Sequence, residues 1–136
     1  MRGSEATCDT SVLVPALLPM HECFPACIRA VERVVALPAH VLFETYRVMT
    51  TLPGGDRVPP ATVRTALEGL VWKPLQLPPE DYLPLIRRLV AAGVAGGPIY
   101  DAQIAATAKH HGLTLLSRDH RAAAVYDLVG VDYELV

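Results

Sequence analysis

Four acidic residues lie beside apolar segments of the chain, where an unpaired carboxylate lowers stability. They are Asp9, Glu44, Asp101 and Asp119. Asp101 begins a helical stripe whose later members, at i+3, i+4 and i+7, are all apolar; these are Ile104, Ala105 and Ala108. Carboxylates held close together repel one another, and a divalent cation removes that conflict. Because carboxylate ligands alone suit Mg²⁺ or Mn²⁺ rather than zinc, the sequence predicts a site for one of these two ions.

Two of the acids follow expected strands. Asp9 is at the carboxyl end of a short buried strand expected over residues 6–9. Asp119 comes just after the apolar strand expected over residues 113–117. Ligands of open α/β sheets bind in the crevice outside the carboxyl ends of the strands, so both side chains are expected at that edge.

The other two acids belong to expected helices. Glu44 shares a helical stripe with Val41 and Val48, at i−3 and i+4. Asp101 lies in the first turns of the helix expected over residues 98–111, which also begins near the strand ends. We therefore expect two acids from strand ends and two from helices to meet in one cleft.

Each acid also has a simpler explanation. Asp9 can serve as a turn or cap residue, and Asp119 can be the N-cap of the last helix. Asp101 is favoured near a helix N-terminus by the helix dipole. Glu44 can form an ion pair with Arg47 at i+3. Because all four explanations would have to hold independently, we favour a common site.

The remaining pattern predicts a single α/β domain over residues 1–136, in which residues 1–4 can be native, an expression tag or disordered. Short apolar strands alternate with helical segments, an order typical of a mainly parallel sheet flanked by helices. Prolines keep the extended segment 72–79 at the edge of the sheet or outside it. The strands are expected at 6–9, 36–39, 113–117 and 131–136, and the helices at 10–18, 22–35, 40–52, 60–71, 79–92, 98–111 and 119–129.

The composition excludes several classes of protein. Hydrophobic residues make up 51% of the 136 residues and charged residues 19%, which is typical of a globular domain rather than a disordered chain. Since aromatic residues are only 6%, the core must be largely aliphatic. No apolar run approaches the roughly 20 residues of a membrane helix, and the first residues lack the order of a signal peptide. With three cysteines, an odd number, we expect a reducing compartment and a cytoplasmic protein without membrane association.

Two further pairs of metal-binding residue types are present. Cys23 and Cys27 are one helical turn apart, but no second ligand pair of matching spacing follows, so we interpret them as small buried hydrophobes. His40 and Glu44 have the same spacing, but the chain contains no HExxH motif. We therefore interpret His40 as a neutral or surface residue near the start of its helix.

The net charge of −2 provides no basic field that would attract nucleic acid. Binding of RNA would therefore require a local patch or a metal. Arg118 and Arg121 flank Asp119, and Lys109 ends the helix that carries Asp101. These three cations are candidates for contacts to RNA phosphates, although each can also be a solvated surface charge.

Three segments resemble the PIN-domain ribonucleases, and especially the VapC toxins of toxin–antitoxin pairs: CDTSVLV, LFETYRV and YDAQIAATAKHHGLTLLSRD. The resemblance covers nearly the whole chain and is most specific in the run from Asp101 to Asp119. It implies a PIN-like three-layer α/β/α fold with a short, mainly parallel sheet. It also implies RNA cleavage that depends on Mg²⁺ or Mn²⁺, inhibition by a VapB antitoxin, and homodimers.

The family's acidic quartet maps onto Asp9, Glu44, Asp101 and Asp119, and its supporting hydroxyls map onto Ser11 and Ser117. Within the quartet, we expect Asp9 and Asp101 to bind the metal directly. Glu44 is expected to bind it or to orient the attacking water, and Asp119 to act through a water.

Our hypothesis is therefore a metal-dependent endoribonuclease toxin that is neutralised by a cognate antitoxin. One alternative is a catalytically inactive PIN-like module that binds RNA or a protein. A second is a small metal-dependent phosphatase, which is disfavoured because CDTSVLV has no second Asp two residues after Asp9. A third is a structural partner protein that uses the apolar faces of the helices between residues 60 and 92. We expect Val63, Leu85 and Leu89 on those faces to pack within the domain instead.

Overall fold

A parallel sheet forms the centre of the computed structural model, which describes residues 4–136. The strands are β1 (Ala6–Cys8), β2 (Ala36–Pro38), β3 (Lys73–Leu75), β4 (Thr114–Ser117) and β5 (Tyr133–Leu135). They pair in the orders β1-β4-β5 and β2-β3, and every pair is parallel. A bridge between Ala6 and Val34 joins the two groups, so the carboxyl ends of all strands face one edge. The expectation of a tag or of disorder includes residues 1–3, which lie outside the described residues.

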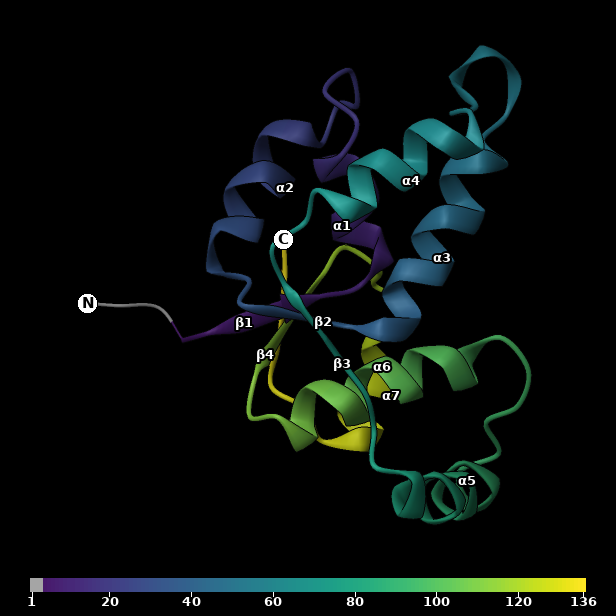
Figure 1. The fold of residues 1–136 in the computed structure, drawn as a ribbon. Coiled ribbons are helices and arrows are strands. Elements are labelled where there is room, and N and C mark those ends of the chain that lie inside the picture. The colour runs from purple at the N-terminus through teal and green to yellow at the C-terminus, as the bar shows by residue number, and fades with distance from the viewer. Residues whose placement is uncertain (1–3) are drawn as a thin grey trace.

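Helices cover both sides of the sheet. They are α1 (Thr10–Ala16), α2 (Phe24–Ala30), α3 (Ala39–Thr50), α4 (Pro60–Glu68), α5 (Tyr82–Ala91), α6 (Pro98–His110) and α7 (Ala123–Val129). Figure 1 shows α1 to α4 on one side of the strands and α5 to α7 on the other. The predicted three-layer α/β/α arrangement with a parallel sheet is confirmed.

Several element boundaries differ from the sequence prediction. The helix expected over residues 22–35 ends at Ala30, because the following residues form a 3-10 turn and Val34 then pairs with Ala6. The helix expected from residue 119 begins only at Ala123. The first strand ends at Cys8, which leaves the next residue free to cap α1. The first difference arises from a contact with a distant strand, whereas local hydrogen bonds of Asp119 and Asp9 account for the other two.

Two other predictions about the elements agree with the structure. The proline-containing segment supplies β3, which within residues 4–136 pairs with β2 alone and is therefore an edge strand, as its prolines require. Val63, Leu85 and Leu89 are buried, in agreement with packing inside the domain.

The core is aliphatic apart from one aromatic side chain. Leu13, Leu37, Ile104 and Leu115 are at most 2% exposed, and Tyr126 is the buried aromatic ring among them. Burial of a side chain of this size contributes about 1.5–3 kcal/mol to the free energy of folding. These contacts therefore supply most of the stabilisation of the helices against the sheet. No helix within residues 4–136 is both long and apolar enough to cross a membrane.

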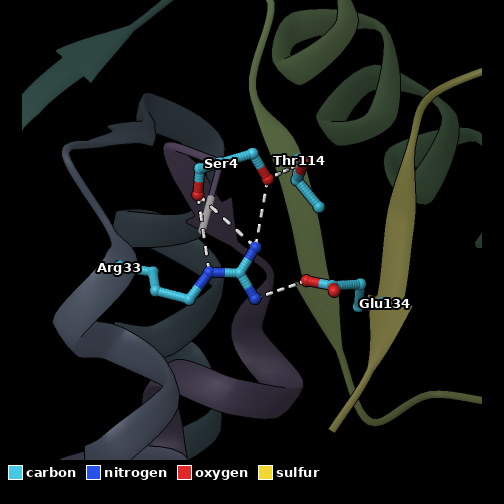
Figure 2. Close-up of polar contacts among 4 residues, drawn as sticks. All are labelled: Ser4, Arg33, Thr114 and Glu134. Carbon is cyan, nitrogen blue, oxygen red and sulfur yellow. Dashed lines mark hydrogen bonds and ion pairs between the residues drawn. The ribbon is translucent and has the colours of Figure 1, made fainter. Parts of the chain in front are cut away.

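A polar cluster ties the start of the chain to the edge of the sheet. Arg33, in the 3-10 turn after α2, donates to the carbonyl and the hydroxyl of Ser4 and pairs with the carboxylate of Glu134 on β5 (Figure 2). The Ser4 hydroxyl also forms a hydrogen bond with Thr114 on β4, with 2.9 Å between the oxygens. One guanidinium therefore links three segments that are far apart in the sequence.

We predict that Arg33→Met lowers the free energy of unfolding by about 1 kcal/mol in urea denaturation, because the pair is partly exposed and therefore screened by solvent. The loss should shrink in high salt. Arg87→Met is the matched control, since Arg87 is exposed on α5 and makes no ion pair within residues 4–136. Equal losses in the two variants would contradict the linking role of Arg33.

Candidate active site

A cavity of about 1150 Å³ opens at the carboxyl edge of the sheet, between α1, α3 and the start of α6. Three of the four predicted acids line it: Glu44, Asp101 and Asp119. They come from α3, from α6 and from the loop after β4, so the fold brings together acids that are far apart in the sequence. Asp9 does not line the cavity, because residues of α1 and β4 cover its carboxylate.

Asp9 is 4% exposed, and both of its carboxylate oxygens are fully engaged. Oδ1 accepts the backbone N–H of Ser11 at 3.0 Å and its hydroxyl at 2.5 Å. Oδ2 accepts the hydroxyls of Ser117, at 2.5 Å, and of Tyr126, at 2.6 Å. Burial raises the pKa of Asp9, and these hydrogen bonds partly offset that effect. A carboxylate has about four acceptor positions, so direct binding of a metal by Asp9 requires the loss of one hydrogen bond.

The two serines connect the buried carboxylate to the loop after β4. Ser11 Oγ accepts the backbone N–H of Arg118 at 2.7 Å, while Ser117 Oγ accepts that of Asp119 at 3.0 Å. Each hydroxyl thus donates to Asp9 and accepts from the loop. The position of the loop acid is therefore coupled to that of Asp9.

Tyr126, on α7, is the part of this cluster that sequence reasoning missed. Its ring is completely buried, and burial together with the negative charge of Asp9 raises its pKa, so the hydroxyl stays a donor. A tyrosine within the apolar run AAAVYDLV was the available signal, because a buried phenol requires an acceptor.

Asp101 is half-buried in the first turn of α6. The stripe that follows it is in the core as predicted, since Ile104, Ala105 and Ala108 have no exposed surface. Burial, and then the negative charges of Asp119, Glu44 and Asp9, raise the pKa of Asp101 to about 6. At neutral pH this carboxylate is charged although burial and the neighbouring acids make that charge unfavourable. A bound cation would remove this unfavourable interaction.

Glu44 lies on the side of α3 that faces the cavity. The buried stripe of this helix is instead Val41, Thr45 and Met49, so Glu44 is at its border and not within it. Among the described residues no ion pair joins Glu44 to Arg47, the alternative partner that the sequence suggested. Glu44 Oε2 lies 3.8 Å from His40 Nε2, one turn back on the same helix.

Asp119 combines a structural and a cavity-lining position. Its Oδ1 accepts the backbone N–H groups of Arg121, at 2.9 Å, and Ala122, at 3.3 Å. It therefore orders the turn before α7, close to the capping role considered from the sequence. The residue also lines the cavity with Glu44 and Asp101.

The three cations proposed from the sequence are not equivalent. Arg118 lines the cavity, and its guanidinium donates to the Ser11 carbonyl and to Cys23 Sγ. The side chain of Arg121 is exposed and does not line the cavity. Lys109 donates to the carbonyl of Val129 at 3.0 Å, at the far end of α6, and lines a different cavity. Lys109 therefore lies outside the cavity that holds the acids, and its contact with RNA stays a prediction.

The donor set suits a hydrated hard cation better than a tightly ligated one. Within residues 4–136, no three His, Cys, Asp or Glu side chains are placed to form a metal site directly. Cys27 is buried as a small hydrophobe, while Cys23 contacts Arg118, so the cysteine pair does not alter this conclusion. Mg²⁺ usually keeps several waters and takes one or two protein carboxylates, and the acids around this cavity fit that mode of binding.

The family model of the PIN domain matches residues 6–128. This chain is a PIN-domain protein. It is 41% identical to Ribonuclease VapC40 of Mycobacterium tuberculosis over 129 residues, which cover 94% of this chain and 96% of that one. It is 36% identical to Ribonuclease VapC27 of the same organism over 124 residues, or 90% of each chain. Among solved structures, FitAcB from Neisseria gonorrhoeae shares the fold with a TM-score of 0.65 and 24% identity, over 94% of this PIN-domain protein and 95% of that chain.

We predict that Asp101→Asn stabilises the metal-free PIN-domain protein at pH 7. The folded-state pKa of about 6 exceeds the ordinary 3.8, so stability of the wild type falls as pH rises from about 4 to 6. The variant lacks this loss and should be more stable by about 1 kcal/mol above pH 6, after allowance for solvent screening. The difference should vanish below pH 4 in thermal denaturation.

The matched control is Asp56→Asn, because Asp56 is exposed in the turn after α3 and lies outside the cavity. Saturating Mn²⁺ should then stabilise the wild type more than Asp101→Asn, since ligand binding to the folded state raises stability. A variant less stable than the wild type at pH 7 without metal would contradict the electrostatic argument.

We predict that Tyr126→Phe destabilises the protein by about 1.5–3 kcal/mol in urea denaturation, because it removes one donor from a buried carboxylate and leaves the ring in place. Tyr133→Phe removes a comparable hydroxyl that donates to exposed Asp127, and should cost less than about 0.5 kcal/mol. Similar losses in both variants would show that the contact to Asp9 has no special weight.

Proposed function

We propose that this protein is a ribonuclease toxin that cleaves RNA phosphodiester bonds with the help of Mg²⁺ or Mn²⁺. The observation that carries the proposal is the cavity at the carboxyl edge of the sheet, where Glu44, Asp101 and Asp119 meet in front of Asp9. Burial, and then the negative charges of the neighbouring acids, raise the pKa of Asp101. Membership of the PIN-domain family and 41% identity to a ribonuclease support the same reading.

Asp101, Glu44 and Asp119 would hold the ion, in part through water. The chemistry that the ion supplies is activation of water and neutralisation of charge on the phosphate. Asp9 keeps the loop after β4 in position through the two serines, and its own charge adds to the field in the cavity. Of the four acids, Asp101 is the main candidate for a direct ligand, because Asp9 would have to give up a hydrogen bond.

Arg118 is the cation best placed to contact a phosphate. A guanidinium carries five N–H donors, and two hydrogen bonds hold this one against Ser11 and Cys23. The remaining donors can serve an anion at the cavity while the side chain stays in place. Arg121 would contribute only from outside the cavity.

The proposed partners are an antitoxin of the VapB type and a second copy of the chain. A homodimer would use the outer face of α5, where Leu83, Ile86 and Val90 are 64%, 51% and 73% exposed. They are spaced at i, i+3 and i+7 and form an apolar stripe on a helix whose other apolar side faces the core.

We predict that Asp101→Asn and Glu44→Gln each reduce RNA cleavage by about 100-fold or more in saturating Mn²⁺, because each removes a charge that holds the ion. Cleavage by the wild type should stop in EDTA. Asp56→Asn should cleave like the wild type, which separates loss of the site from a general effect of charge.

The assay follows labelled RNA on denaturing gels, with circular dichroism to confirm folding. Full activity in both cavity variants would sink the proposal. Hydrolysis of a small phosphate ester without RNA cleavage would favour the phosphatase alternative. Absence of both activities and of Mn²⁺ binding by calorimetry would favour the inactive module.

A further inference from the structure

One wall of the acid cavity carries aromatic rings rather than charges. His40 and Phe43 are neighbours at i and i+3 on α3, and both line the cavity. Tyr100, from the first turn of α6, packs face to face on His40, with 4.9 Å between ring centroids and 8° between ring planes. We call Phe43, His40 and Tyr100 the aromatic wall.

The aromatic wall is unusually accessible. Phe43 is 82% exposed and Tyr100 is 48% exposed, although phenylalanine is among the residues most often buried in folded proteins. His40 covers one face of Tyr100, and no other ring stacks on Tyr100 in the part of the chain that the structure describes. The exposed part of the Tyr100 ring is therefore the place where a further flat group could pack.

The charges around the cavity give RNA little electrostatic attraction, so another kind of contact has to contribute to its binding. Only Arg47 and Arg118 carry fixed positive charge among its lining residues, against the carboxylates of Glu44, Asp101 and Asp119. The whole chain has a net charge of −2. Attraction of phosphates, which dominates most binding of nucleic acids, is therefore weak here without metal. Stacking of a base on an aromatic ring does not depend on that attraction.

We infer that the aromatic wall is a nucleobase subsite, in which one unpaired base of the RNA packs against the exposed rings of Phe43 and Tyr100. The inference rests on the proposed ribonuclease function for the identity of the substrate. Tyr100 is the residue next to Asp101, so a base in this subsite belongs to a nucleotide beside the phosphodiester at the acids. The base must be unpaired, because stacking and pairing in a duplex cover its faces and edges.

A protein side chain could also cover exposed aromatic residues, but two observations favour a base. The rings line the same cavity as the acids, and the His40–Tyr100 pair is a flat parallel stack that matches the geometry of stacked bases. The apolar stripe on α5, in contrast, carries no stacked rings.

The test measures binding of a fluorescein-labelled single-stranded RNA by anisotropy in EDTA, where no cleavage occurs. Tyr100→Ala and Phe43→Ala should each weaken binding about 5- to 100-fold, the range expected for loss of one stacked base. Tyr100→Phe keeps the ring and should bind within about 2-fold of the wild type. Val71→Ala is the matched control, since Val71 is an exposed apolar residue outside this cavity and outside the apolar stripe of α5, and it should have no effect.

A second measurement covers the case in which an alanine variant does not fold. Phe43→Trp places an indole on the wall, and its fluorescence should be quenched by a nucleoside monophosphate but not by ribose 5-phosphate. Val71→Trp, at an exposed position outside the cavity, should respond to neither compound. The same RNA annealed to its complement should bind the wild type and Tyr100→Ala equally.

The outcomes separate this inference from the proposed function. If the wild type cleaves RNA in Mn²⁺ but Phe43→Ala and Tyr100→Ala keep its KM and affinity, the subsite is wrong and the nuclease proposal stands. If the indole at position 43 is quenched by nucleotides but no RNA is cleaved, the nuclease proposal fails and the subsite stands. If the variants bind RNA normally but alter self-association in size-exclusion chromatography, the wall is a protein contact and the inference is overturned.

Discussion

The carboxylate of Asp9 is the constraint on which the rest of the active-site geometry depends. A buried charge of this kind is tolerated only when donors surround it, and here they come from α1, β4 and α7. Those donors in turn fix the loop that carries Arg118 and Asp119. Asp9 thus fixes the position of the cavity's loop through hydrogen bonds without lining the cavity itself. The acids that line the cavity remain available to a ligand.

The cluster of acids around the cavity lowers the stability of the folded protein while it provides a site for a ligand. Asp101 is placed on a stripe whose other members belong to the core, and the neighbouring acids oppose its ionisation. A folded domain gains nothing from such a cluster unless a cation joins it. The aromatic wall is a second case, because exposed rings are also unfavourable for an isolated chain. Residues that weaken the isolated protein therefore gather around one cavity, a pattern that physical reasoning associates with binding and catalysis.

Much of this could be predicted from the sequence, and the exceptions share a cause. Acids after strand ends and on helical stripes predicted the cavity, because those positions follow from local periodicity and the parallel topology. Tyr126 and the early end of the helix before Val34 were not predictable in that way, since each depends on a contact with a distant segment. Lys109 is a further example. Its place on the same helix as Asp101 could be predicted from the sequence, but its hydrogen bond to the carbonyl of Val129 could not. The local sequence pattern indicates which residues are candidates for catalysis or binding. Tertiary packing determines which of those side chains lie in the same cavity.

The location of Tyr126 has a consequence for the order in which the molecule can work. During synthesis, Asp9, Glu44 and Asp101 leave the ribosome well before the final helix does. A growing chain at that stage holds most of the acids but lacks the phenol that completes the cage around Asp9. The set of hydrogen bonds around Asp9 is therefore completed only after α7 has been synthesised, later than every element that carries Asp9, Glu44 or Asp101.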